Sequence, residues 1–158
     1  MYTFFFTEKS PFSQFHRCLF TAGELTFMCA EQYMMHGKAI LFGDREIAAQ
    51  IMVADTPMKQ KALGRKVKGF DDKVWKQNRE VIVLAGNRLK FTQNPDLKAA
   101  LLATKGTTLV EASPYDRIWG IGLSAKDPRA QNEATWKGQN LLGKILTKLR
   151  DELLAEEA

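Results

Sequence analysis

The hydrophobic pattern near the start of the chain is that of β-strands. Tyr2–Phe6 is a run rich in aromatic residues, and Gly23–Cys29 carries apolar side chains at every second position. A period of two is typical of a strand with one buried face. We therefore predict two short strands here, which could pair as a small antiparallel sheet. Thr107–Val110 is apolar and β-branched enough to form another strand.

From Glu31 onward the spacing of apolar residues changes to that of helices. Apolar side chains recur three and four positions apart, and Asp, Asn or Pro stands where several helices would begin. The clearest helix runs from about Trp136 to Leu154, with leucine and isoleucine along one face. This pattern predicts a mainly α, or α+β, fold in which a few short strands cover one side of the helices. The other predicted helices begin near Glu31, after Asp44, at Pro57, after Asp71 or Asp72, and at Asn94–Pro95.

The length and organisation of the chain indicate one domain. It has 158 residues, is 45% hydrophobic, and contains no internal repeat and no linker rich in Pro, Gly or Ser. We therefore predict a single compact domain over residues 1–158. Strands and crossover helices do not alternate, and neither the GxGxxG turn nor the P-loop occurs, so the sequence excludes a doubly wound nucleotide-binding fold.

The net charge and the cysteine content limit which ligands and which cellular compartment the sequence indicates. Lysine and arginine number 23 against 18 acidic residues, which gives a formal charge of +5. That balance suits an anionic ligand such as a phosphate ester, and is too small to indicate nucleic-acid binding without clustering. No apolar run approaches the roughly 20 residues of a membrane span, no signal peptide is recognisable, and Cys18 and Cys29 lack metal or redox spacing. We expect a cytoplasmic protein with no membrane contact, no metal and no cofactor.

The first candidate site is the pair Glu31 and Lys38. Seven residues are two helical turns, so both side chains project from one helix face, about 10.5 Å apart along the axis. Met34 and Met35 lie between these two residues in the sequence and could form the floor of a pocket for a planar ligand. A partly desolvated Lys38 could act as an amine nucleophile toward a sugar carbonyl. The alternative is an ordinary surface lysine and a glutamate that favours the helix dipole.

The second candidate site follows the predicted strand at Thr107–Val110. Here Glu111 leaves an apolar strand, a proline turn follows, and Asp116, Trp119 and Gly120 come next, a pattern that favours a pocket rim over a core. We expect Glu111 to act as general acid or base, Asp116 to bind sugar hydroxyls, and Trp119 to offer a flat face to a heterocycle. Gly120 would let a backbone come close. The alternative is that Asp116 pairs with a neighbouring arginine, Arg117 or Arg129, and that Trp119 belongs to the core.

The third candidate is a basic run. Five bases occur within ten residues that contain no acid, and we single out Arg65 for phosphate because its guanidinium can bind two oxygens at once. A solvated face is the alternative. No aromatic residues are interleaved with these bases, which argues against nucleic-acid binding. The run consists of Lys59, Lys61, Arg65, Lys66 and Lys68.

Six strings of residues, in order along the chain, together resemble the NADAR, or YbiA-like, N-glycosidase family. No single string is persuasive, but six ordered strings across nearly the whole chain are highly specific. The resemblance implies a mainly α-helical domain. The strings are Ser10–Phe15, Glu31–Met35 with Lys38–Ala39 and Phe42–Asp44, Leu63–Arg65, Glu111–Pro114 with Asp116, Ile118–Gly122, and Trp136–Gly143.

The resemblance also implies an activity, the hydrolysis of an N-glycosidic bond. Bacterial single-domain members cleave ribosylaminopyrimidine 5′-phosphates, early intermediates of riboflavin synthesis, to ribose 5-phosphate and an aminopyrimidine. Other members remove ADP-ribose from guanine in modified nucleic acid, where a lysine is thought to form a Schiff base. The positions that match the family's functional residues are Glu31, Lys38, Glu111, Asp116 and Trp119.

Combining the residues with the resemblance gives a working hypothesis. Carboxylates would stabilise a cation-like sugar and protonate the leaving nitrogen. Tyr33 and Trp119 would stack on the base and Arg65 would bind phosphate, while Lys38 would be the nucleophile or a second phosphate contact. The partner is then a small phosphorylated glycoside, with nucleic acid only as a modified substrate. The alternatives are an ADP-ribosyl-guanine hydrolase and a non-catalytic module that binds ADP-ribose or a phosphometabolite.

Overall fold

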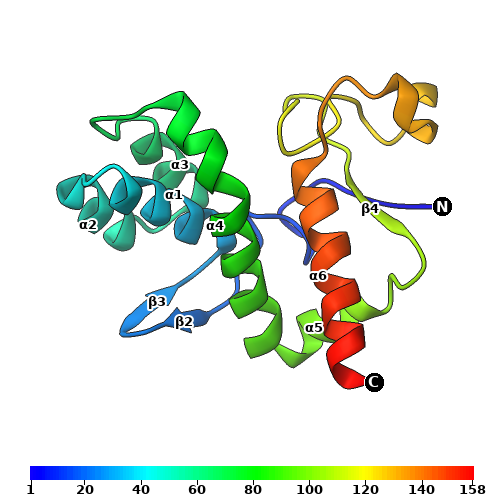
Figure 1. The fold of residues 1–158 in the computed structure, drawn as a ribbon, viewed down its shortest axis with the longest axis horizontal. Coiled ribbons are helices and arrows are strands. Elements are labelled where there is room, and N and C mark those ends of the chain that lie inside the picture. Colours follow the sequence, from blue (N-terminus) through cyan, green and yellow to red (C-terminus); the bar gives the residue numbers. More distant parts are fainter. The chain divides into compact units, whose positions relative to one another are not determined.

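The computed structural model describes residues 1–158 and divides into two compact units. We call Gln14–Asn94 the central unit, and Met1–Ser13 with Pro95–Ala158 the terminal unit. Figure 1 shows that helices dominate and that the strands are few and short, which confirms the predicted α+β class. No helix is both long enough and apolar enough to cross a membrane.

In the central unit, helix α1 lies against three others, and both predicted aspartate caps are confirmed. Asp44 accepts a hydrogen bond from the backbone N–H of Ile47, and Asp71 accepts from Lys73 and Val74. A small antiparallel hairpin packs beside α1 and α4. The elements are β2 (Phe20–Ala22), β3 (Leu25–Phe27), α1 (Ala30–Leu41), α2 (Arg45–Val53), α3 (Pro57–Gly64) and α4 (Asp72–Gln93).

The terminal unit is built on a two-stranded parallel sheet covered by the last helix. Tyr2 lies opposite Thr108 and Phe5 opposite Glu111 in the sheet register. The predicted apolar stripe of the last helix is confirmed, since Leu142, Ile145, Leu146, Leu149 and Leu153 are all buried. The elements are β1 (Tyr2–Phe5), α5 (Pro95–Leu102), β4 (Thr108–Glu111), two short 3-10 helices, η1 (Pro128–Gln131) and η2 (Glu133–Thr135), and α6 (Leu141–Glu157).

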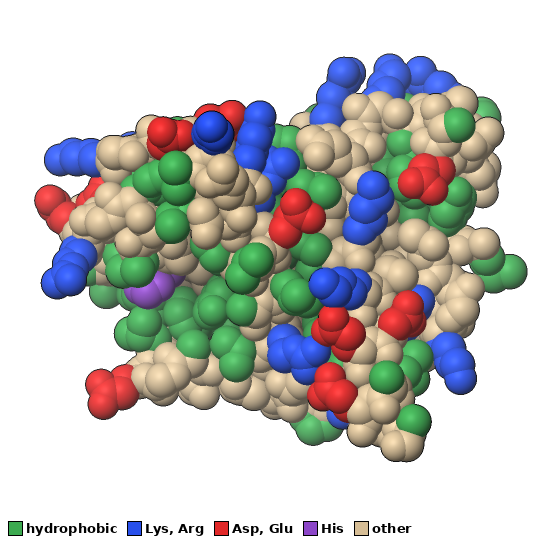
Figure 2. All heavy atoms as spheres, viewed as in Figure 1, with side chains coloured by type: hydrophobic (Ala, Val, Ile, Leu, Met, Phe, Trp, Pro, Cys, Tyr) green, Lys and Arg blue, Asp and Glu red, His purple; other side chains and the backbone are tan.

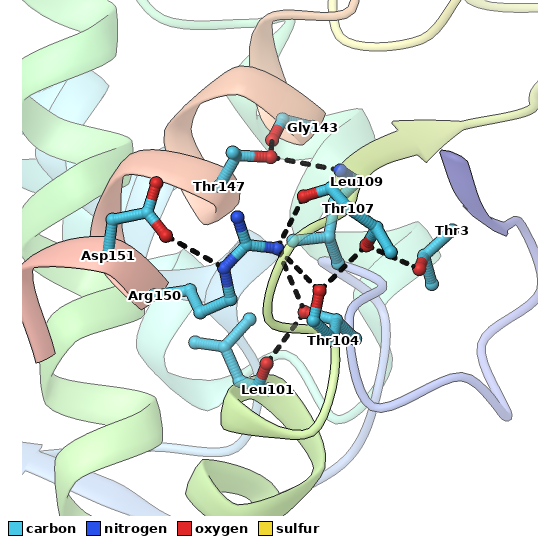
Figure 3. Close-up of polar contacts among 9 residues, drawn as sticks. All are labelled: Thr3, Leu101, Thr104, Thr107, Leu109, Gly143, Thr147, Arg150 and Asp151. Atoms are coloured by element: carbon cyan, nitrogen blue, oxygen red, sulfur yellow. Dashed lines mark hydrogen bonds and ion pairs between the residues drawn. The ribbon is translucent and has the colours of Figure 1, made fainter. Parts of the chain in front are cut away.

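A buried arginine ties α6 to the segment that leads into β4. Arg150 is 3% exposed, and its Nη1 donates hydrogen bonds to the carbonyl oxygens of Thr104 and Thr107 and to Thr104 Oγ1 (Figure 3). One turn earlier, Thr147 Oγ1 accepts from the N–H of Leu109 at 2.9 Å. These contacts fix the start of β4 against α6 and so set where Glu111, at the end of the strand, emerges.

Two local predictions are wrong. The strand at Tyr2–Phe5 pairs in parallel with β4, not with the strand after Gly23, because β3 pairs with its sequence neighbour β2 across a tight turn at Gly23, where φ is 60°. The last helix begins at Leu141 rather than near Trp136. Asn140 has φ 53°, which a right-handed helix does not admit, so the helix begins only beyond it.

Candidate functional site

Helix α1 presents Glu31 and Lys38 from a firmly fixed backbone. Its N-terminus is capped by Cys29, whose Sγ accepts from the N–H of Gln32. The buried Gln32 side chain binds three backbone groups: its Oε1 accepts from Met28 N at 2.8 Å, and its Nε2 donates to the carbonyls of Ile51 and Met52. These contacts tie α1 to the end of α2, so the first turn of α1 has little freedom.

Glu31 and Lys38 act on each other electrostatically, as a shared helix face requires. Glu31 is only 4% exposed, and Lys38 is half-buried. Burial lowers the pKa of Lys38 from its ordinary value of 10.5, while the Glu31 carboxylate raises it and the positive charge of Arg65 lowers it. The structure thus brings two predicted site residues, Glu31 and Arg65, within electrostatic reach of a third, Lys38.

Two aromatic rings that sequence patterns do not single out enclose the Lys38 ammonium. Its Nζ lies 4.8 Å from the ring centroid of Phe70 and 5.7 Å from that of Trp75. The faces of such rings attract cations. Phe70 precedes α4 and Trp75 lies in its first turn, so only the packing of α4 against α1 places them here. Sequence offered one signal, an aromatic residue after the glycine of a basic run.

Tyr33 lies in an aromatic cluster of the central unit. Its ring centroid is 6.1 Å from that of Phe20 and 5.1 Å from that of Phe27. It also covers Gly86 of α4, where an added Cβ would come within 2.5 Å of the Tyr33 ring. These contacts describe a packing role, and the stacking of Tyr33 on a substrate base stays a prediction.

The basic run divides into two parts. Lys59 pairs with Asp55 at 2.9 Å and Lys61 lies 5.8 Å from the ring centroid of Phe15. The second part, Arg65, Lys66 and Lys68, is exposed beyond the end of α3. Of these three bases, Arg65 acts electrostatically on Lys38. Exposed positive charge is what a phosphate group needs, so the three are its candidate ligands.

In the terminal unit, Glu111 ends β4 and is held by its backbone on both sides. Its N–H donates to the side chain of Asn140 at 3.0 Å, and its carbonyl accepts from Ile121 at 3.0 Å. Asn140 is fully buried and also donates from Nδ2 to the carbonyl of Leu109. Asn140 therefore has a structural role. The sequence does not predict this role, because it depends on a left-handed backbone conformation that the residue pattern does not reveal.

The loop after Glu111 is organised by Asp116. Its Oδ1 accepts from the N–H groups of Ile118 and Trp119, both at 2.8 Å, which closes an Asx-type turn. The alternative in which Asp116 pairs with Arg129 is wrong, because Arg129 pairs with Asp127 instead. Trp119 is half-buried in this loop.

Gly120 is required by the protein's own backbone. An added Cβ would lie 2.9 Å from the carbonyl oxygen of Glu111 and 3.0 Å from that of Asp116. The chain therefore approaches itself here, and a role of Gly120 in substrate binding stays a prediction. The close approach packs Glu111, Asp116, Trp119 and Gly120 into one tight loop.

Other features of the surface fall outside these two clusters. A shallow groove of about 590 Å³ follows α6, and it contains none of the predicted site residues. No group of three His, Cys, Asp or Glu side chains is arranged to hold a metal ion. Figure 2 shows acidic and basic side chains interspersed over much of the face in view, with several bases gathered above η1 and η2. The groove is lined by Thr108, Lys144, Thr147, Lys148, Asp151, Glu152 and Ala155.

Comparison with known proteins confirms the family. The model of the NADAR domain matches residues 3–154. "N-glycosidase R617" of Acanthamoeba polyphaga mimivirus is 51% identical over 126 residues, which are 80% of this chain and 74% of that protein. "N-glycosidase YbiA" of Escherichia coli (strain K12) is 30% identical over 150 residues, 95% of this chain and 85% of that protein.

A solved structure and a plant protein extend the comparison. The NMR structure of YbiA from E. coli superimposes with a TM-score of 0.81 at 28% identity, covering 99% of this chain and 86% of that chain. The maize "Riboflavin biosynthesis protein PYRR, chloroplastic" is 34% identical over 114 residues, which are 70% of this chain and 16% of that protein. Fold and relatives together define an α+β protein of a class that includes N-glycosidases, hydrolases of N-glycosyl bonds. The chain belongs to the NADAR family.

Proposed function

We propose that this protein hydrolyses the N-glycosidic bond of ribosylaminopyrimidine 5′-phosphates and releases ribose 5-phosphate and an aminopyrimidine. The support is its membership of a family whose relatives are named N-glycosidases, together with similarity to a plant riboflavin biosynthesis protein. The observation that carries the proposal is the half-buried Lys38, whose pKa is lowered by burial and which lies within electrostatic reach of the buried Glu31 and the exposed Arg65.

The proposed reaction starts with the neutral Lys38 amine. Its Nζ adds to C1 of the sugar and gives a proton to the Glu31 carboxylate, while the C1–N bond to the base breaks. The leaving nitrogen takes a proton from an acid, the role we assign to Glu111. The C1–O bond of the ring then opens, the ring oxygen takes the proton held by Glu31 to become the C4 hydroxyl, and C1 is left doubly bonded to Nζ as an iminium. Water adds to C1 and gives one proton to Glu111, which restores the acid. The proton of the new C1 hydroxyl passes to Nζ as the C1–Nζ bond breaks, so the neutral amine is restored and the open-chain aldehyde of ribose 5-phosphate leaves.

The remaining assignments concern binding. Arg65 would bind the 5′-phosphate, with Lys66 and Lys68 adding positive charge. Asp116 uses Oδ1 for its turn, so its other oxygen, Oδ2, is the one we assign to the sugar hydroxyls. Trp119 would stack on the pyrimidine. A binding module would have no use for carboxylates beside a phosphate-bearing ligand, which favours the enzyme.

The test is incubation of the purified protein with 2,5-diamino-6-ribosylaminopyrimidinone 5′-phosphate, in parallel with an ADP-ribosylated guanine oligonucleotide. Mass spectrometry follows free sugar phosphate and released base. Release from the small precursor alone supports the proposal. Release from the oligonucleotide alone assigns the protein to ADP-ribose removal. An intact ligand on both arms contradicts the proposal and makes the binding module the leading hypothesis.

A substitution pair sharpens this test. Glu111→Gln and Lys38→Ala are each expected to lower turnover of the small precursor by at least about a hundredfold. Arg129→Lys, which changes an exposed base paired with Asp127, is the matched control and should keep wild-type turnover. Wild-type turnover in folded Lys38→Ala and Glu111→Gln proteins would contradict the proposed roles.

A further inference from the structure

The segment between α3 and α4 covers the Lys38 amine. Phe70 lies at its end, is 45% exposed, and places its ring 4.8 Å from Lys38 Nζ. Phe42, at the end of α1, packs against Phe70 at 5.3 Å with the two rings inclined by 57°. An aromatic ring this exposed is held in place by something other than burial in the core.

Asp44 supplies that hold. Its Oδ2 accepts a hydrogen bond from the backbone N–H of Lys68 at 2.9 Å, while its Oδ1 caps α2 through Ile47. These two backbone hydrogen bonds are the main reason that the pKa of Asp44 lies below its ordinary value. One carboxylate therefore fixes both the start of α2 and the segment that carries Phe70.

The backbone then turns the ring toward the amine. Gly69 has φ 77°, a conformation that residues with a side chain rarely adopt, and it stands directly between Lys68 and Phe70. A Cβ at Gly69 would lie 3.5 Å from the carbonyl oxygen of Phe42. The glycine turn thus brings Phe70 back over α1 after the chain leaves Asp44.

The Phe70 ring affects the charge of the Lys38 nitrogen as well as its position. Burial disfavours the charged form of the amine, whereas the negative faces of Phe70 and Trp75 attract a cation whether it is an ammonium or an iminium. The other charges acting on Lys38 are Glu31 on α1 and Arg65 at the end of α3. An aliphatic residue in place of Phe70 would keep part of the burial and lose the attraction.

We propose that Phe70 is a positioning residue that holds Lys38 Nζ over its ring and stabilises the cationic Lys38–C1 iminium, and that Asp44 anchors it through Lys68. This inference rests on the proposed function, because it concerns the covalent step assigned there to Lys38. It adds to the proposed machinery an aromatic ring that acts on the Lys38 nitrogen and that no motif of the sequence marks.

The test compares Phe70→Leu with the conservative Phe70→Tyr. Borohydride donates a hydride to C1 of the iminium and converts it to a stable secondary amine, so the rate of adduct formation in the presence of 2,5-diamino-6-ribosylaminopyrimidinone 5′-phosphate reports the intermediate. Phe70→Leu is expected to lower this rate and kcat by about three- to thirtyfold, the range of a cation–π contact, with KM changed less than about twofold. Phe70→Tyr should restore both, since it keeps the ring.

Two further variants separate positioning from folding. Phe6→Leu removes an aromatic ring of similar exposure, 43%, from the terminal unit and should leave trapping unchanged. Asp44→Ala should lower trapping as Phe70→Leu does, whereas Thr56→Ala, which removes only the cap of α3, should not. Thermal melting shows that each protein compared is folded.

The outcomes distinguish this inference from the proposed function. If the wild-type protein forms no adduct and releases no sugar phosphate, the proposed function fails. If the wild-type adduct forms on Lys38 and folded Phe70→Leu traps and turns over at the wild-type rate, only the positioning role is overturned. A loss in Phe70→Leu that Phe70→Tyr does not restore, or a rise in KM with kcat unchanged, also contradicts it.

Discussion

At the scale of single residues, burial lowers the pKa of two lysines. Lys38 is half-buried beside charges of both signs, and Lys90 is fully buried in α4. In both, desolvation is the largest cause of a lowered pKa. The lowered pKa has a different effect at each site. At Lys38 it favours the neutral amine that the proposed reaction needs, and at Lys90 it makes the free energy of unfolding depend on pH.

The pH dependence of the reaction should report Lys38. Because the neutral amine is the nucleophile, kcat/KM should rise with pH through an apparent pKa below the ordinary 10.5 of lysine. Arg65→Gln removes a positive charge that lowers this pKa, so the rising limb should move to higher pH while KM increases. Profiles of kcat/KM against pH for the two proteins check this. A limb that stays in place in Arg65→Gln would contradict the electrostatic link.

The pH dependence of stability should report Lys90. Burial lowers its pKa to about 8 in the folded protein, against 10.5 when solvated. Between these values the unfolded chain binds more protons than the folded protein, so the free energy of unfolding rises with pH, by at most about 3 kcal/mol from this group. Urea titrations from pH 8 to 10.5 should show a smaller rise for Lys90→Met. An equal rise in both proteins would show that Lys90 is not the group responsible.

At the scale of elements, sequence predicts what is local. The helix starts at Asp44 and Asp71 are predictable because a cap lies within three residues of the N–H groups it binds. The parallel pairing of β1 with β4 is not predictable from the sequence, because it joins segments far apart in the chain and depends on the packing of α6 against β4. The start of α6 is not predictable either, because Asn140 adopts a left-handed conformation that composition does not reveal.

The same distinction holds for the candidate site. Glu31 and Lys38 share a helix, so their spacing alone places them on one face. Asp116 closes its turn with the N–H groups of its own neighbours, Ile118 and Trp119. The residue pattern does not indicate this local contact, because it favours a sugar contact or an arginine pair. Phe70 and Trp75 reach Lys38 only through the packing of α4 against α1 and the hydrogen bond from Lys68 to Asp44, and no spacing in the sequence encodes that.

Arg150 is the clearest test of how an element is held. Its guanidinium donates hydrogen bonds to oxygens of Thr104, Thr107 and Asp151, in a geometry that a lysine cannot match. Arg150→Lys should lower the free energy of unfolding by about 2–4 kcal/mol in urea titrations, because buried acceptors lose their donor. The matched control, Arg129→Lys, changes an exposed pair and should leave the midpoint nearly unchanged. Equal effects of the two substitutions would mean that the buried network contributes little.

At the scale of the whole molecule, one family model spans both compact units. The match runs over residues 3–154, so the α1 cluster and the Glu111 loop both belong to the NADAR domain. The similarity in fold to YbiA extends over 99% of the chain.

The role of Lys38 as the nucleophile of an N-glycosidase can be tested by trapping the covalent intermediate. The wild-type protein is incubated with 2,5-diamino-6-ribosylaminopyrimidinone 5′-phosphate and borohydride, digested, and analysed by peptide mass spectrometry. We predict a reduced pentose 5-phosphate adduct on the peptide that contains Lys38, formed together with release of the aminopyrimidine, and no adduct in Lys38→Arg. Release of the aminopyrimidine at the wild-type rate by folded Lys38→Arg, with no adduct on either protein, would rule out this role.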